Sequence, residues 1–168
     1  LLSRRWVVIL AVSIGIGGAL LLLIYLQWTR TIMGQLPADL RPSCSTTDNT
    51  SATCSLPDRT VVFYRLFDTA TEARADVVNG KELAPDGTPC PPSSAPPAET
   101  PVVCSYEAGA ETGVAAFSQT VQPPLGFYDV RWSPAAHSRL RGAMATENTT
   151  AQDWERLRSN WTRLAEMD

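Results

Sequence analysis

One long apolar run constrains this chain more than any other feature of its sequence. Residues 6–28, WVVILAVSIGIGGALLLLIYLQW, contain no charged side chain, and arginines flank them on both sides. As an α-helix the run is about 35 Å long, which exceeds the hydrocarbon core of a bilayer, about 30 Å. The run is also longer than the apolar part of a cleavable signal peptide, and no small-residue cleavage motif follows it. We therefore expect an uncleaved transmembrane helix.

Small residues recur at four-residue spacing in the middle of this run, in two overlapping rows. Such rows allow a second transmembrane helix to approach closely. The alternative is that glycine is simply frequent in membrane helices. We expect these residues to pack against a helix of another protein or of a second copy. The expected contact residues are Ala11, Ser13, Gly15, Gly17, Gly18 and Ala19.

The four cysteines, Cys44, Cys54, Cys90 and Cys104, all follow the apolar run. An even number of cysteines in a small domain beyond a membrane anchor favours two disulfide bonds in an oxidising compartment. Their spacings match no common zinc pattern, so a Cys₄ zinc site is the weaker alternative. Of the three possible connectivities we expect Cys44–Cys54 and Cys90–Cys104, because each pair closes a short loop beside a predicted strand.

The cysteines also orient the predicted helix, because the flanking arginines alone do not. Disulfide bonds form outside the cytoplasm, so we expect a single-pass protein of the cell membrane with a cytoplasmic N-terminus. The expected organisation is a cytoplasmic flank over 1–5, a transmembrane helix over 6–28, a linker over 29–43 and an extracytoplasmic domain over 44–168.

The charge of this domain argues against nucleic acid as a partner. Without Arg4, Arg5 and Arg30 the chain keeps 11 of its 14 basic residues and all 17 acidic ones, a net charge of 11 − 17 = −6. Binding to nucleic acid or to anionic lipid needs a basic surface. Arginine outnumbers lysine 13 to 1, and alanine and proline are abundant, which indicates a high-G+C coding bias typical of actinobacteria.

Secondary structure signals predict an α+β fold. Residues 61–67, VVFYRLF, are β-branched and aromatic and predict a strand. Thr69 and Glu72 form a capping-box pattern that predicts a helix to about residue 79. Ser133 followed by Pro134 predicts a helix over 133–145. Three further strands are expected over 102–106, 113–119 and 126–132, and a proline-rich irregular loop over 84–101. We expect a four-stranded antiparallel sheet with helices on one face.

An apolar stripe marks the last predicted helix, which begins at the Thr150 and Asp153 capping pattern. The stripe is formed at spacings of three, four and three residues by Trp154, Leu157, Trp161 and Leu164. Side chains at this spacing share one helix face. This face packs either on the sheet of the domain itself, which we favour, or on a partner protein.

No residue pattern predicts catalysis. His137 is the only histidine, and Ser133 precedes it by four residues. A serine–histidine pair is typical of nucleophilic catalysis, but Ser133 has the position of a helix cap and no acidic residue is placed to orient the histidine. One histidine leaves no metal-ligand set, and no phosphate-binding glycine loop occurs. We therefore expect no enzyme activity, no catalytic or metal-binding residue and no cofactor.

The domain resembles extracytoplasmic domains of actinobacterial single-pass membrane proteins, a type sometimes appended to serine/threonine protein kinases. The similarity covers about residues 44–165 and includes the cysteines, the VVFYRLF strand, the YDVRW strand and the final W-x-x-L-x-x-x-W helix. The resemblance implies a disulfide-stapled α+β module and transfers no chemistry.

Together these features predict a non-catalytic accessory or structural subunit of a bacterial membrane protein complex, such as a respiratory or envelope transport assembly. Its partners would be the membrane and other transmembrane helices, with no nucleic acid. The alternative is an extracytoplasmic ligand-sensing domain of a transmembrane signalling protein, whose small-molecule ligand the sequence does not identify.

Overall fold

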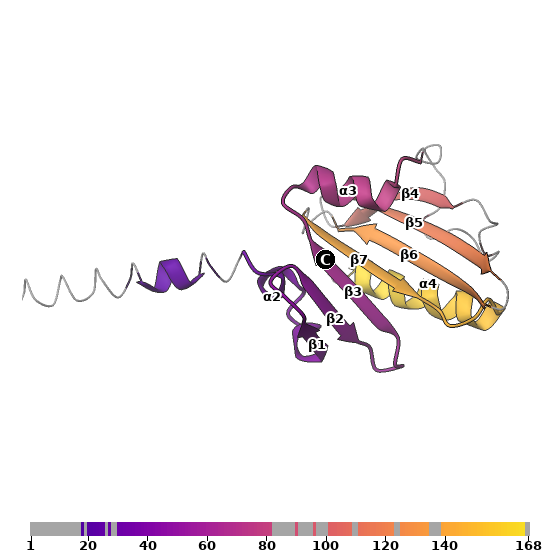
Figure 1. Ribbon diagram of the computed structural model, residues 1–168, viewed down its shortest axis with the longest axis horizontal. Helices are drawn as coiled ribbons and strands as arrows, with labels where there is room; N and C mark the ends of the chain where they lie inside the picture. Colours follow the sequence, from indigo (N-terminus) through magenta and orange to yellow (C-terminus); the bar gives the residue numbers. More distant parts are fainter. Residues whose placement is uncertain are drawn as a thin grey trace, which may run out of the picture.

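A seven-stranded antiparallel β-sheet forms the centre of the described part of the chain (Figure 1). The strands lie in the order β1-β2-β3-β7-β6-β5-β4, so β7 joins two units of three consecutive strands. The computed structural model describes residues 18, 20–25, 27, 30–81, 90, 96, 101–108, 111–122, 125–134 and 139–166.

The elements have the following bounds. The strands are β1 (Cys44–Thr46), β2 (Ser51–Ser55), β3 (Val61–Leu66), β4 (Val102–Ala108), β5 (Glu111–Gln122), β6 (Leu125–Ser133) and β7 (Leu140–Ala145). The helices are α2 (Ile32–Gln35), the 3₁₀-helix η1 (Arg41–Ser43), α3 (Ala70–Val78) and α4 (Ala151–Glu166).

Helix α4 covers one face of the sheet and forms the main core with it. Its stripe is buried: Trp154, Leu157, Trp161 and Leu164 are each at most 2% exposed. Phe117 of β5 contacts the rings of Trp154 and Trp161 edge-on, with centroids 5.9 and 5.2 Å apart. Large aromatic side chains bury much apolar area and prefer this edge-to-face geometry. The two tryptophans therefore pack on the sheet of this domain.

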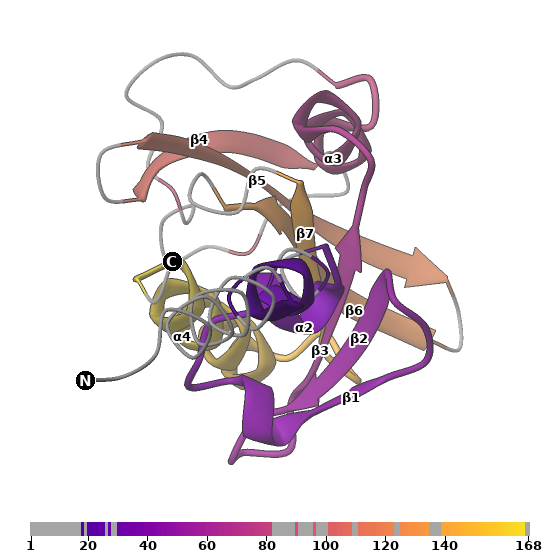
Figure 2. The same ribbon diagram turned by 90° about the vertical axis from the view of Figure 1, so that its left-hand side faces the viewer.

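Helix α3 lies on the opposite face, where it covers only part of the sheet (Figures 1 and 2). Val77 of this helix belongs to a small apolar cluster with Val103, Val114 and Ala116 of β4 and β5. Thr69 and Glu72 form the predicted capping box, and Asn79 ends the helix in the left-handed conformation. The helix is short, nine residues, so among the described residues no helix lies above strands β2 and β3 on this face (Figure 1).

The segment before β1 contributes to the core. Ile32, Leu36 and Leu40, which fall in the expected linker over 29–43, are buried against the α4 side of the sheet. The backbone N–H of Ile32 donates to the carbonyl oxygen of Asn49 in the β1–β2 turn at 2.9 Å. This hydrogen bond and the apolar contacts tie the segment to the domain.

The prediction of a four-stranded sheet with helices on one face is wrong. The sheet has seven strands among the described residues, and helices lie on both of its faces. The main error is the helix expected over 133–145, because residues 140–145 form the inner strand β7. Its backbone pairs with β3 on one side and with β6 on the other. These long-range pairings override the local helix signal of Ser133 and Pro134.

The prediction of a transmembrane helix over 6–28 is contradicted, and so is the expected single-pass localisation in the cell membrane. Within the described residues no helix is long and apolar enough to cross a membrane. Residues 1–17 lie outside the described part of the chain.

Candidate functional site

The alternation of side chains along the inner strands creates an uncovered area on the α3 side of the sheet. Val62, Tyr64 and Leu66 of β3 point into the core, whereas Val61, Phe63 and Arg65 are exposed. The same alternation operates on β6 and β7. We call the resulting area the open half-face, formed by Phe63, Arg65, Phe127, Asp129, Arg131, Arg141, Ala143 and Ala145.

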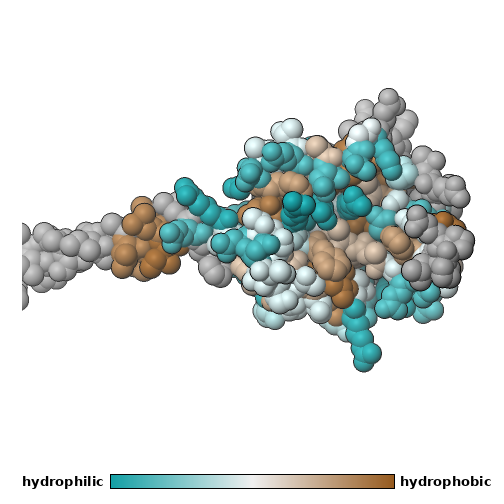
Figure 3. Space-filling model, in the orientation of Figure 1, coloured by the Kyte–Doolittle hydropathy of each residue, from teal (hydrophilic) through white to brown (hydrophobic). Residues whose placement is uncertain are grey.

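A groove of about 460 Å³ runs over the open half-face. Two of the β7 residues in its lining, Ala143 and Ala145, have small side chains between larger neighbours, which leaves space above them. Ala143 lies opposite Phe63 of β3 and opposite Arg131 of β6 in the strand register. The groove therefore has Phe63 on one side and Phe127, Asp129 and Arg131 of β6 on the other. Figure 3 shows apolar and hydrophilic surface side by side on this face of the molecule.

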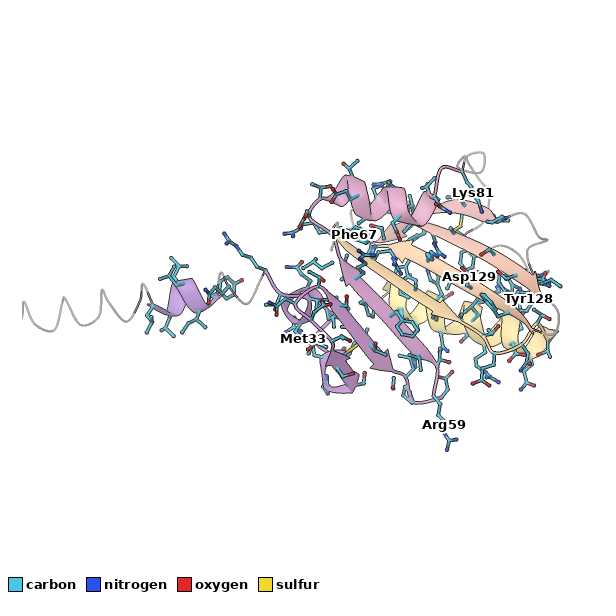
Figure 4. All side chains as sticks on the ribbon, viewed as in Figure 1. Met33, Arg59, Phe67, Lys81, Tyr128 and Asp129 are labelled. Carbon is cyan, nitrogen blue, oxygen red and sulfur yellow. A yellow bond between two sulfur atoms is a disulfide. The ribbon has the colours of Figure 1, made fainter. Side chains whose placement is uncertain are left out.

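Three arginines cluster at the α3 end of the open half-face. Arg65 and Arg141 are direct cross-strand partners on β3 and β7, a like-charge arrangement that is destabilising without compensation. Asp76 of α3 compensates Arg141 through an ion pair of 2.9 Å. Arg65 instead lies over the ring of Phe67, 5.0 Å from its centroid, near the end of β3 in Figure 4.

Among the described residues Arg131 has only a weak ion-pair partner. Its side chain is 46% exposed, and its Nε lies 3.9 Å from a carboxylate oxygen of Asp129, beyond hydrogen-bond distance. Asp129, labelled over the middle of the sheet in Figure 4, accepts a short hydrogen bond from the Ser118 hydroxyl. The carboxylate of Asp129 is thus held by β5 rather than by Arg131.

The electrostatics agree with this geometry. Burial lowers the pKa of Arg141 below its ordinary value, and the positive charges of Arg131 and Arg65 act in the same direction, against the opposing effect of Asp76. A guanidinium remains protonated at any physiological pH. The lowered pKa of Arg141 therefore reflects mainly its burial, and the nearby charges of Arg131 and Arg65 add to this effect.

A second groove, of about 420 Å³, lies between the β2–β3 turn and the start of α4. Here the buried amide of Asn160 donates to the carboxylate of Asp58 at 2.8 Å and to the Thr60 hydroxyl at 3.0 Å. Burial raises the pKa of Asp58, but hydrogen bonds from Asn160 and Thr60 lower it more, so it lies below its ordinary value. These contacts fix the turn against α4, and we assign them a structural role.

The residues singled out from the sequence fall in different places. The disulfide bonds Cys44–Cys54 and Cys90–Cys104 are both present, which confirms the expected pairing. Ser133 is buried at the end of β6, whereas His137 lies outside the described residues. Of the small residues proposed for helix packing only Gly18 is described, and it is exposed. The described residues contain no group of three or more potential metal ligands.

Sequence reasoning missed the open half-face. The signal was available in part, because alternate residues of the VVFYRLF strand include an arginine between apolar side chains. The sequence predicted a strand over residues 61–67 without assigning its two faces, whereas one face of β3 is exposed. Which face lacks a covering helix depends on the position of α3, and this position is not encoded locally.

The proline-rich loop expected over 84–101 lies mostly outside the described residues, and only residues 90, 96 and 101 are described.

Comparisons with protein-family models, with curated proteins and with solved structures find no match for this chain.

Proposed function

We propose that this chain is a non-catalytic accessory module of a larger protein assembly, and that it docks its partner through the open half-face. The observation that supports this function is the exposure of Phe63, 54%, on an inner strand of the sheet. Apolar residues of inner strands are usually covered by a second layer of structure. A partner protein would supply that layer here.

The composition of the open half-face fits a protein partner. Phenylalanine and arginine lie side by side around the groove, and aromatic and arginine side chains are enriched at protein interfaces. Phe63 is 54% exposed, so covering it would stabilise a complex by about half of the 1.5–3 kcal/mol for burying a whole side chain, or about 1 kcal/mol. Val61, also exposed on β3, extends the apolar strip toward the β2–β3 turn.

Site-specific crosslinking tests this function. A photoreactive phenylalanine analogue at position 63 should give one discrete crosslinked species with a different protein when the chain is irradiated in cells that produce it natively. The matched control carries the same analogue at Glu155, an exposed position of α4, and should give no such species. Equal crosslinking at both positions, or none at position 63, would contradict the proposed docking surface.

A ligand-sensing module is the second candidate, because the groove over the open half-face has a volume of about 460 Å³. This volume lies within the range of small-molecule sites, about 300–1,000 Å³. A thermal-shift screen of small apolar anions distinguishes the two functions. A stabilising compound whose effect disappears in F63S, without crosslinking to a protein at position 63, would favour ligand sensing.

A further inference from the structure

We infer that the arginine cluster of the open half-face recognises an acidic segment of a partner protein, which places an apolar side chain beside Phe63 and carboxylates beside Arg65 and Arg131. This inference deepens the proposed docking function and names the chemistry of the partner. It rests on the arrangement of strands β3, β7 and β6 and on the different partners of their arginines: within the described part of the chain Arg141 has a close carboxylate, whereas Arg65 and Arg131 do not.

The first step concerns charge. The chain is acidic overall, with a net charge of −3, yet the open half-face and the adjoining α3 bring three arginines together against Asp76 and Asp129. Asp76 pairs with Arg141, and Asp129 accepts from Ser118. Within the described residues the guanidinium groups of Arg65 and Arg131 donate no hydrogen bond. Three arginines and two aspartates leave the site with one positive charge in excess, 3 − 2 = +1, and with guanidinium donors that an anionic partner would complement.

The second step concerns spacing. Phe63 and Arg131 lie on strands β3 and β6, which are separated by β7 and hence by about 9–10 Å. Phe63 and Arg65 are two positions apart on the same face of β3, about 7 Å. An extended segment spans about 3.3 Å per residue. An apolar anchor with an acidic residue two or three positions away would reach both walls of the groove.

The third step concerns the class of partner. The groove lies on the surface of the sheet, with the small side chains of Ala143 and Ala145 in its lining, and the side chain of Arg131 in the same lining is 46% exposed. Small-molecule sites usually enclose most of their ligand, whereas a protein segment can bury a shallow surface by lying across it. Arginine on the rim also suits carboxylates, because its planar donors match both carboxylate oxygens. These features favour an acidic peptide segment over a free metabolite.

Selection from a random library of 12-residue peptides tests this inference on the full chain. Peptides enriched on the wild-type protein should combine Leu, Phe or Trp with Asp or Glu two or three positions away. Their affinity should fall about ten-fold in R65E/R131E, because each carboxylate then meets a like charge. The matched control R59E/R156E changes the net charge equally, at exposed positions outside the groove, and should bind within about two-fold of wild type.

A charge swap provides the decisive comparison. Peptides whose carboxylates are replaced by lysine should bind R65E/R131E better than they bind the wild-type chain, and all variants should show a cooperative thermal transition well above the temperature of the binding assay. Enrichment of basic or uncharged peptides, or equal affinity for R65E/R131E, would overturn the inference. Binding that depends on Phe63 but not on the arginines would overturn it while leaving the docking function intact.

The same experiment separates other occupants of the surface. Binding of the wild-type chain to vesicles with phosphatidylglycerol, without peptide enrichment, would overturn the inference in favour of a lipid surface. Self-association in sedimentation, abolished by F63S, would overturn it in favour of a second copy of this chain. No enrichment of any peptide on the wild-type protein would overturn both the inference and the proposed docking function.

Discussion

The packing of Gly142 against Trp132 gives a quantitative test of the fold. A Cβ atom at Gly142 would lie 2.3 Å from Cε2 and Cζ2 of the Trp132 ring. Carbon atoms in contact are about 3.5 Å apart, so the ring would have to retreat by more than 1 Å. Trp132 is fully buried and meets the ring of Tyr64 edge-on at 5.9 Å. The G142A substitution therefore forces a rigid part of the core to move.

The expected cost of G142A is about 2 kcal/mol. Overpacking a well-packed core costs about 1–3 kcal/mol, and the clash here is with a buried ring, which places the cost near the upper end. Replacing glycine by alanine in a strand would otherwise stabilise it by about 0.5–1 kcal/mol. The difference leaves a net loss of about 2 kcal/mol, a large fraction of the stability of a small domain.

Urea denaturation under oxidising conditions measures this loss, and a double-mutant cycle locates its cause. In W132F the smaller ring should relieve the clash, so that G142A costs little in that background. The control A143V adds two methyl groups at the neighbouring position, toward the open half-face, and should cost less than about 1 kcal/mol. If G142A costs the same in the wild-type and W132F backgrounds, the contact with Trp132 is not the cause and this reasoning fails.

Three further predictions concern other parts of the structure. The pKa of Asp58 is lowered in the folded protein. Its carboxylate therefore stabilises the fold above the unfolded pKa, about 3.9, and this stabilisation is lost as the pH falls through the folded pKa. Urea titrations should show that D58N loses less stability than wild type when the pH is lowered from 6 to 3. Replacing Cys44 and Cys54 by alanine removes a short covalent loop and should cost about 2–3 kcal/mol in the same assay. W161A should cost about 3–5 kcal/mol by deleting a buried ring, whereas E155A should stay within about 0.5 kcal/mol; equal losses would contradict the packing of α4.

The parts of the fold that follow from short-range signals were predictable. The β-branched and aromatic run at 61–66 forms β3, and the Thr69–Glu72 pattern caps α3. The hairpin between the strands at 102–108 and 111–122 also follows from a turn between two apolar runs. In each case the residues that carry the signal lie within one turn or one strand of the element that they specify.

Strand β7 was not predictable for the opposite reason. Leu140, Met144 and the two alanines favour a helix by intrinsic propensity, and Ser133 with Pro134 resembles a helix start. The backbone is instead fixed by pairing with β3, more than 70 positions earlier, and with β6. Gly142 fits this position because its missing side chain leaves room for Trp132. That requirement becomes visible only when both strands are in place.

The position of β7 also explains why the candidate site could not be predicted from the sequence. Phe63 and Arg65 come from the first three-strand unit, Arg131 from the second, and Ala143 from the strand that joins them. Strands β3 and β6 are neighbours of β7, which pairs with both of them, so these residues come together only when β7 lies between β3 and β6. The open half-face is thus a property of the complete sheet. A substitution that destabilises the sheet, such as G142A, should weaken partner binding only in proportion to the unfolded fraction. A substitution on the groove itself, such as R131E, should weaken binding while the sheet stays intact. Loss of binding without loss of stability is therefore the observation that separates a docking surface from a merely exposed part of the fold.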